Sequence, residues 1–137
     1  MIIEVNNVSI TRDSVYLLKD VNWKINKEEH WAVLGLNGSG KTTLLNMLNG
    51  YIFPTAGDVS VLGKTLGSYD MRQLRKSIGW VSSSIQERLH GYETALDIVL
   101  SGKFASIGLY DEPTDEDIIL ASSLLDKLSC LHFATRH

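Results

Sequence analysis

The fold of this chain is decided by the stretch Gly35-Leu36-Asn37-Gly38-Ser39-Gly40-Lys41-Thr42. It matches the pattern G-x-x-x-x-G-K-[ST] at every specified position, and this pattern is typical of loops that hold the phosphates of a nucleotide. Its glycines let the backbone curl until successive N–H groups point inward at phosphate oxygens. The sequence therefore predicts a phosphate-binding loop.

The residues on either side predict a strand before the loop and a helix after it. His30–Leu34 is a short apolar run that follows the polar stretch Asn26–Glu29, which predicts a buried strand. Thr42–Asn49 has three leucines at helical spacing, and Gly50 is placed to end that helix. A strand, a glycine-rich turn and a helix form the context in which this pattern binds phosphate.

Two side chains at the end of the loop have separate chemical roles. Lys41 brings a mobile positive charge to the β- and γ-phosphates, and the N-terminus of the following helix adds a favourable field for anions. The hydroxyl of Thr42 is placed to ligate Mg²⁺, which prefers oxygen ligands and bridges phosphates. The candidate nucleotide-binding residues of this region are Gly35, Asn37, Gly38, Ser39, Gly40, Lys41, Thr42 and Thr43.

The composition bounds the class of protein. The 137 residues suffice for one domain, 44% of them are hydrophobic, and a net charge of −3 offers no broad basic face for nucleic acid. The single cysteine, Cys130, favours a reducing, cytoplasmic compartment, and no apolar run is long enough to span a membrane. The histidines show no metal-ligand spacing, so we expect them to be structural or on the surface.

Patterns in the rest of the chain predict a β-rich beginning and a helical end. Strands are predicted over Ile2–Ile10, Leu17–Ile25, Asp58–Gly63 and Ile78–Ser82. Helices are predicted over Ser68–Lys76, Ala95–Leu100 and Asp115–Leu128. The first two strands alternate apolar and polar residues, so we expect them to form an antiparallel pair or a small sheet.

Four blocks of sequence carry a resemblance to a known family. They are Leu18–Val21, Gly35–Thr43 with the two leucines that follow it, Pro54–Gly57 and Ile78–Val81. In this order and at this spacing, the chain resembles an ABC-type ATPase, the nucleotide-binding domain of ATP-binding-cassette proteins. The stretch Ile78–Ser84 is similar to the molybdate-linked cytoplasmic branch of that family.

The resemblance implies an α/β fold, namely a P-loop NTPase of the ABC type. It divides the chain into an antiparallel β part (1–30), a phosphate-loop α/β core (31–84) and the start of a helical part (85–137). It also implies that the chain corresponds to the N-terminal half of such a domain, because the family's Leu-Ser-Gly-Gly-Gln-like signature loop, later Asp-Glu strand end and switch histidine are absent. The apolar faces of the later helices are then expected to be partly exposed or covered by another copy.

In function, the resemblance implies an ATP-binding subunit of an ABC transporter that hydrolyses Mg·ATP to power transport. Two such domains close around two ATPs in this family, so the expected partners are a homodimer or second ABC ATPase domain and a membrane permease. We expect a cytoplasmic protein, peripheral at the inner face of the membrane. The alternative is a soluble ABC ATPase with a regulatory role. Because the family's signature loop completes the site, residues 1–137 alone are expected to bind Mg·ATP without turnover.

Two positions depart from the family pattern. The aromatic residue that usually stacks on adenine is replaced by Arg12, whose guanidinium can stack on a flat base, and Tyr16 is a nearby alternative. The glutamine that contacts Mg²⁺ and the attacking water falls at Ser83, with Gln86 three residues on. A serine hydroxyl is shorter and would act through water, so Ser83 and Gln86 are both candidates for this catalytic role.

Other assignments of function are less favoured. Leu109–Thr114 resembles the family's catalytic Asp-Glu segment, but a glycine interrupts the run before it, so we expect a loop that caps the helix beginning near Asp115. A GTPase would need D-x-x-G after the loop, which is absent, and Asn26–Glu29 lacks the final Asp of N-K-x-D. A small-molecule kinase is not favoured because the chain has no Arg-rich lid.

Overall fold

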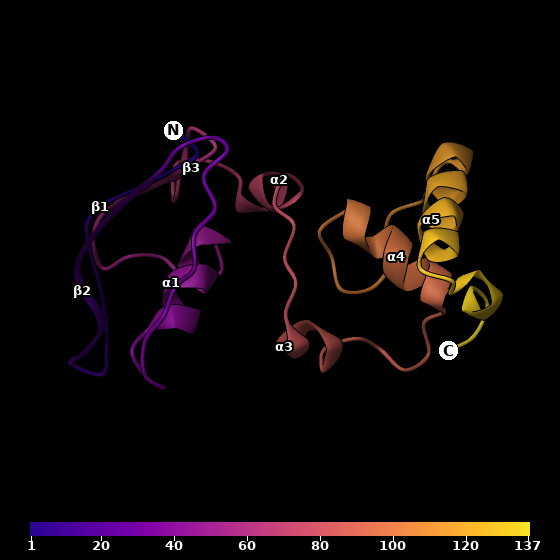
Figure 1. Ribbon diagram of the computed structural model, residues 1–137, viewed down its shortest axis with the longest axis horizontal. Coiled ribbons are helices and arrows are strands. Elements are labelled where there is room, and N and C mark those ends of the chain that lie inside the picture. The colour runs from indigo at the N-terminus through magenta and orange to yellow at the C-terminus, as the bar shows by residue number, and fades with distance from the viewer. The chain divides into compact units, whose positions relative to one another are not determined.

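The computed structural model describes residues 1–137, which form two units, Met1–Ile78 and Gly79–His137 (Figure 1). The first unit contains a β-sheet and the helix that follows the glycine-rich loop. The second unit is helical.

Strands β1 (Ile3–Arg12) and β2 (Val15–Ile25) form an antiparallel hairpin, which confirms the predicted pair. The turn between them is Asp13-Ser14, and both residues have positive φ, as a tight two-residue hairpin turn requires. Strand β3 (Ala56–Val61) pairs with the other edge of β1, and β4 (Lys64–Thr65) pairs with β3. The sheet order is therefore β2-β1-β3-β4.

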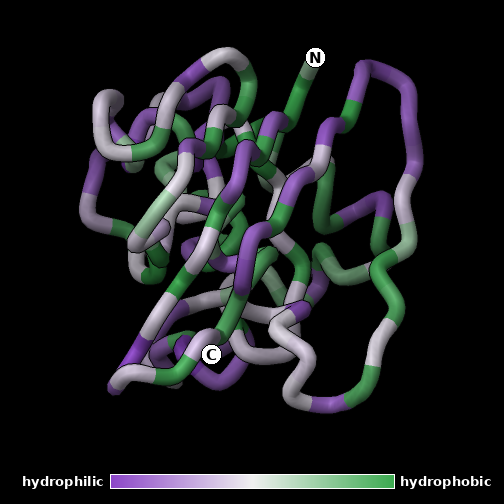
Figure 2. The backbone as a smooth tube through the Cα atoms, turned by 90° about the vertical axis from the view of Figure 1, so that its left-hand side faces the viewer, coloured by the Kyte–Doolittle hydropathy of each residue, from purple (hydrophilic) through white to green (hydrophobic).

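The core of the first unit lies between the sheet and helix α1 (Lys41–Leu48). Hydrophobic and hydrophilic residues alternate along the strands (Figure 2), because successive side chains point to opposite faces. The largest fully buried side chains are Val5, Val8, Met47 and Val59. Burial of side chains of this size stabilises a fold by about 1.5–3 kcal/mol each.

Helix α1 begins and ends as the sequence predicts, within one residue. Its last turn is capped by Asn49, and Gly50 follows in the left-handed region with φ of 68°. Arg75, the last residue of α2 (Met71–Arg75), donates from Nη1 to the Gly50 carbonyl at 3.2 Å and stacks on the Tyr51 ring. Helix α2 is shorter than the predicted Ser68–Lys76, because Asp70 caps its N-terminus by accepting from the Arg72 N–H.

Two predicted strands are wrong as elements of this structure. His30–Leu34 and Ile78–Ser82 carry no strand or helix assignment, and neither pairs with any strand of the sheet. Some of their apolar side chains are fully exposed, with Leu34 91% and Val81 101% exposed, whereas Ile78 packs against the core of the first unit. A strand exists only where a neighbour completes its backbone hydrogen bonds, and neither segment has a strand partner.

The second unit is built from α3 (Ser83–Gln86), α4 (Ala95–Lys103), α5 (Asp115–Lys127) and the short 3₁₀ helix η1 (Leu131–Phe133). Leu100 and Ser101 of α4 are buried, as are Ala121 and Leu125 of α5. The last residues return to the start of α4, where the backbone N–H groups of its first two residues donate to the carbonyls of Arg136 and Ala134. This return satisfies donors that a helix N-terminus otherwise leaves without a partner.

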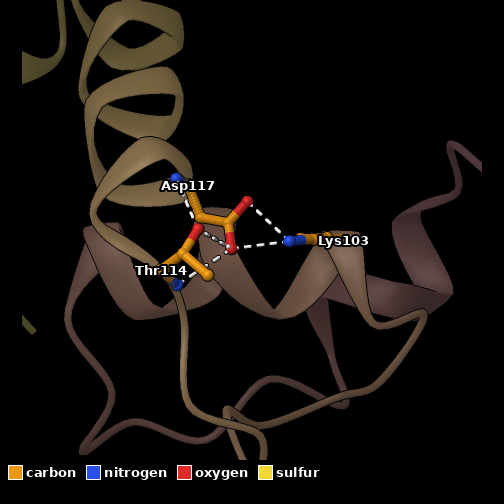
Figure 3. A network of polar contacts seen from close by, with 3 residues as sticks. All are labelled: Lys103, Thr114 and Asp117. Atoms are coloured by element: carbon orange, nitrogen blue, oxygen red, sulfur yellow. Dashed lines mark hydrogen bonds and ion pairs between the residues drawn. The ribbon is translucent and has the colours of Figure 1, made fainter.

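A polar network joins α4 to α5 (Figure 3). The Lys103 ammonium lies 2.6 Å from both carboxylate oxygens of Asp117, which also accepts from the Thr114 N–H and hydroxyl in a capping box. The hydrogen bond from Lys103, and to a smaller extent those from Thr114, lower the pKa of Asp117 to about 2. The network fixes the N-terminus of α5 beside the last turn of α4.

The segment Leu109–Thr114 is a loop that leads into the cap of α5, which confirms the predicted loop. Gly108 has φ of 97°, and the Leu109 N–H donates to the buried carboxylate of Glu93. Several apolar side chains of α5 and its C-cap residue remain exposed, as expected for this part of the chain: Ile119, Leu120, Leu124 and Leu128. The helices of the structure are all too short or too polar to cross a membrane.

Candidate nucleotide-binding site

The glycine-rich loop turns sharply into α1. The Ser39 N–H donates to the Leu36 carbonyl at 3.2 Å, and Gly38 and Gly40 both have positive φ, at 78° and 91°. Gly40 is the N-cap of α1, and its carbonyl accepts the first helical bond, from the Leu44 N–H at 2.8 Å. The free N–H groups of the first turn are therefore presented at the loop, where an anion is favoured.

Gly40 also packs against β2 at very short range. A Cβ at this position would lie 2.7 Å from the Leu17 carbonyl oxygen and 2.7 Å from Leu18 Cδ2. Only glycine accepts both this contact and the left-handed backbone without strain. The close approach places the end of the loop directly on the sheet.

Lys41 holds the loop closed from its own first turn. Its Nζ donates to the carbonyls of Gly35 and Leu36 at 2.8 and 2.7 Å, and lies 3.5 Å from Ser39 Oγ. A Cβ on Gly35 would meet Ser39 Oγ at 2.7 Å, so the first glycine leaves room for this arrangement. The Lys41 ammonium thus contacts two backbone carbonyls and one side-chain hydroxyl of the loop.

These elements enclose a cavity of about 360 Å³. Its lining residues are Leu17, Asn37, Gly38, Gly40, Lys41, Thr42 and Thr43. The lining carries one cation, backbone donors and two threonine hydroxyls, and no carboxylate. This donor set fits the oxygens of a polyphosphate, and a threonine hydroxyl fits the coordination of Mg²⁺ to that phosphate.

The structure brings the predicted loop residues together at one cavity. Six of the eight residues line the cavity, whereas Gly35 and Ser39 contact the Lys41 ammonium and are not among the lining residues. Arg12 and Tyr16 lie at the hairpin end and are not among the lining residues. The Arg12 guanidinium is 3.9 Å from Asp13, and the ammonium of Lys19 lies 5.4 Å from the Tyr16 ring centroid. Their proposed contact with adenine remains a prediction.

Ser83 and Gln86 belong to the second unit, as the first and last residues of α3. Both are exposed to solvent. Their proposed roles toward metal and water remain predictions.

Leu17 is the lining residue that the sequence did not indicate. It is an exposed apolar residue on a strand, a pattern that gives no sign of a ligand. The signal available in the sequence was its place immediately before the Leu18–Val21 block.

Comparison with known proteins identifies the family. The family model described as ABC transporter matches residues 18–137. The chain is 44% identical over 99% of its length to YlmA of Bacillus subtilis, an uncharacterized ABC transporter ATP-binding protein, and covers 52% of it. It is 39% identical over 93% of its length to YmeB of Lactococcus lactis, an uncharacterized protein of the same description, and covers 49% of it.

Among solved structures, the chain is similar to the dimeric ATP-binding cassette MJ0796 in a post-hydrolysis state bound to ADP and Pi. The TM-score is 0.75 at 26% identity, over 97% of this chain and 60% of that one. The chain spans about half the length of the curated relatives that it matches. Its α/β fold is that of the ABC-type P-loop NTPases, and the chain belongs to the ABC transporter family.

Proposed function

We propose that the chain binds the phosphates of Mg·ATP in the cavity formed by the glycine-rich loop and β2, as the nucleotide-binding part of an ABC transporter subunit. The observation that carries this proposal is the convergence of the Lys41 ammonium and the N-terminus of α1 on one cavity without a carboxylate. A bound polyphosphate would take the place of the Gly35 and Leu36 carbonyls as the partner of Lys41. The charge-assisted bonds so formed are the strongest that this lining can make.

The metal would be held through Thr42. This residue lies in the first turn of α1, its side chain is exposed and it lines the cavity. Mg²⁺ neutralises phosphate charge and takes oxygen ligands in octahedral geometry. A single protein hydroxyl together with phosphate oxygens and water is a common way to hold it.

The base would extend past Leu17 toward the hairpin end. Tyr16 precedes Leu17 on β2 and lies opposite Thr11, and Arg12 is the next residue of β1. Either side chain offers a flat face to adenine. If Tyr16 stacks on the base, Tyr16→Ala weakens the binding of ATP but leaves the affinity for inorganic tripolyphosphate unchanged, and Arg12→Ala has no effect on either.

We further propose that these 137 residues bind nucleotide without turning it over. No group in the lining of the cavity can act as a general base toward an attacking water. In a transporter, a second ABC ATPase domain and a membrane permease would complete the assembly at the cytoplasmic face of the membrane. The similarity to a cassette that is a dimer with ADP and Pi supports the first partner.

Calorimetric titration with Mg·ATP tests the proposal. The wild-type chain should bind saturably, and Lys41→Ala should bind about tenfold to hundredfold more weakly, because bonds to a charged group contribute about 1.5–3 kcal/mol. Lys64→Ala removes the same charge from β4 of the same unit and should bind like the wild type. Equal binding by wild type and Lys41→Ala would overturn the proposal.

A further inference from the structure

The register of β1 and β2 shifts three times, and two of these shifts flank Leu18, next to the nucleotide cavity. At one of them Leu17, which lines the cavity, is an extra residue of β2 between the pairs Ile10–Leu18 and Thr11–Tyr16. The other lies just beyond Leu18. Val8 pairs with Val21 and Ile10 pairs with Leu18, so two residues of β2, Lys19 and Asp20, stand opposite Ser9 alone. Such a bulge adds one residue to a strand and leaves a backbone group without its ladder partner. Asp20 has φ of 49°, which is the left-handed conformation that bulges often use.

Ser9 fastens this bulge with its side chain. Its hydroxyl oxygen accepts from the Asp20 N–H at 3.0 Å and donates to Asp20 Oδ1 at 3.4 Å. Ser9 is only 6% exposed, and its carbonyl accepts from both the N–H and the hydroxyl of Thr55 at 2.9 Å. One buried serine therefore fixes the bulge of β2 to the rest of the sheet.

The extra residue decides which way the next residues face. Successive side chains of a strand point to opposite faces, so a shift of one residue exchanges the two faces. With the bulge in place, Leu18 is buried in the core, and the Leu17 carbonyl meets Gly40. Without the extra residue, Leu18 would turn outward and the surface that receives Gly40 would be lost.

We propose that Ser9 and Asp20 are positioning residues of the phosphate-binding cavity, which act by holding Leu17 and Leu18 against Gly40. Neither residue lines the cavity. Loss of the Ser9 hydroxyl removes the acceptor of the Asp20 N–H, so the bulge is no longer held in one conformation. Gly40, the last glycine of the loop, then loses its fixed position against β2. The affinity for phosphate then falls although every group that touches phosphate is still present.

Two variants and a control test this inference, which rests on the proposed function. Ser9→Ala should weaken both Mg·ATP and Mg·tripolyphosphate by the same factor, about two- to tenfold, the equivalent of one hydrogen bond. Asp20→Ala removes both the Oδ1 acceptor and the tolerance for positive φ, and should likewise weaken both ligands by one common factor. Ser60→Ala, on β3 of the same sheet, is the matched control and should bind normally.

Loss of fold is separated from loss of position by a second readout. Binding is measured far below the melting temperature of each variant, and ¹⁵N–¹H amide spectra are recorded without nucleotide. Ser9→Ala should shift the amides of Gly40 and Lys41, whereas Ser60→Ala should leave them in place. Unchanged loop amides, or unchanged affinity in Ser9→Ala, would refute the inference. A wild-type chain that binds neither ligand would refute the proposed function, and the loop amides would then still decide the inference.

Discussion

The ammonium of Lys41 lies 2.8 Å from the carbonyl oxygen of Gly35, at the opposite end of the same loop. This bond is exposed to solvent, as is the second bond to the Leu36 carbonyl. Carbonyls at an exposed site can bond water instead, so the lysine can leave them at low cost when a polyphosphate enters. The Lys41 ammonium therefore stays at the loop through two exposed bonds that it can exchange for bonds to phosphate.

Lys41→Ala should therefore separate binding from stability. The two freed carbonyls become hydrated, so the free energy of unfolding should change by no more than about 0.5 kcal/mol. The affinity for Mg·ATP should nevertheless fall steeply. Urea denaturation of both chains in the absence of nucleotide checks the first part, and a large loss of stability would show that the lysine is a structural residue.

Gly40 and Gly38 should respond differently to the same substitution. Both have positive φ, so a side chain costs about 1–2 kcal/mol at either position. A Cβ on Gly38 meets nothing within 4 Å, whereas one on Gly40 meets the Leu17 carbonyl at 2.7 Å. Gly40→Ala should thus lose more stability than Gly38→Ala by thermal unfolding. Equal losses would contradict the close packing of the loop on β2.

Thr42→Ala should remove the contribution of Mg²⁺ to the affinity for ATP. Its affinity for Mg·ATP should fall to that for ATP in the presence of EDTA, and Thr42→Ser, which keeps the hydroxyl, should restore the difference. Titrations with and without Mg²⁺ measure both values. A Thr42→Ala chain that still binds ATP more tightly with Mg²⁺ would show that another residue holds the metal.

The ion pair between Lys103 and Asp117 should make the stability depend on acid pH. The pKa of Asp117 in the folded chain, about 2, lies below its ordinary value of 3.8. Its contribution is therefore complete above about pH 4 and is lost as the pH falls toward 2. The stability difference between wild type and Asp117→Asn should shrink over this range in urea denaturation. Glu116→Gln, one residue earlier, is the control, and a difference that does not vary with pH would exclude the ion pair as its cause.

Glu112→Gln should leave both nucleotide affinity and any residual turnover unchanged. The residue lies in the loop before the cap of α5, with no strand before it to present a carboxylate. Calorimetry and a phosphate-release assay on the variant measure the two quantities. A marked loss of either would give Glu112 a place in the chemistry.

The sequence predicts the elements whose partners are close in the chain. Local signals predict the β1–β2 hairpin, α1 with Gly50 after it, and α5 with the loop before it. These signals are alternation, helical spacing and residues that end helices. His30–Leu34 carries an equally clear apolar run, yet forms no strand, because a strand also needs a neighbour.

The candidate site shows the same difference between residues with a local signal and residues that depend on other strands. The loop pattern predicts the residues that line the cavity from Asn37 to Thr43, because their chemistry is contained in one stretch. Leu17 meets the loop from another element, and Ser9 bonds Asp20 across two strands at a bulge. The position of these residues depends on the register of the sheet. A single sequence does not encode that register in any local pattern.

The most direct test of the central claim is a titration of the ¹⁵N-labelled chain with Mg·ATP, followed through the backbone amides. We predict saturable shifts that are largest at Gly38, Gly40 and Lys41, at the start of α1, and that disappear in Lys41→Ala. Shifts that do not saturate, or that are centred outside the glycine-rich loop, would contradict the assignment of this loop as the phosphate-binding site.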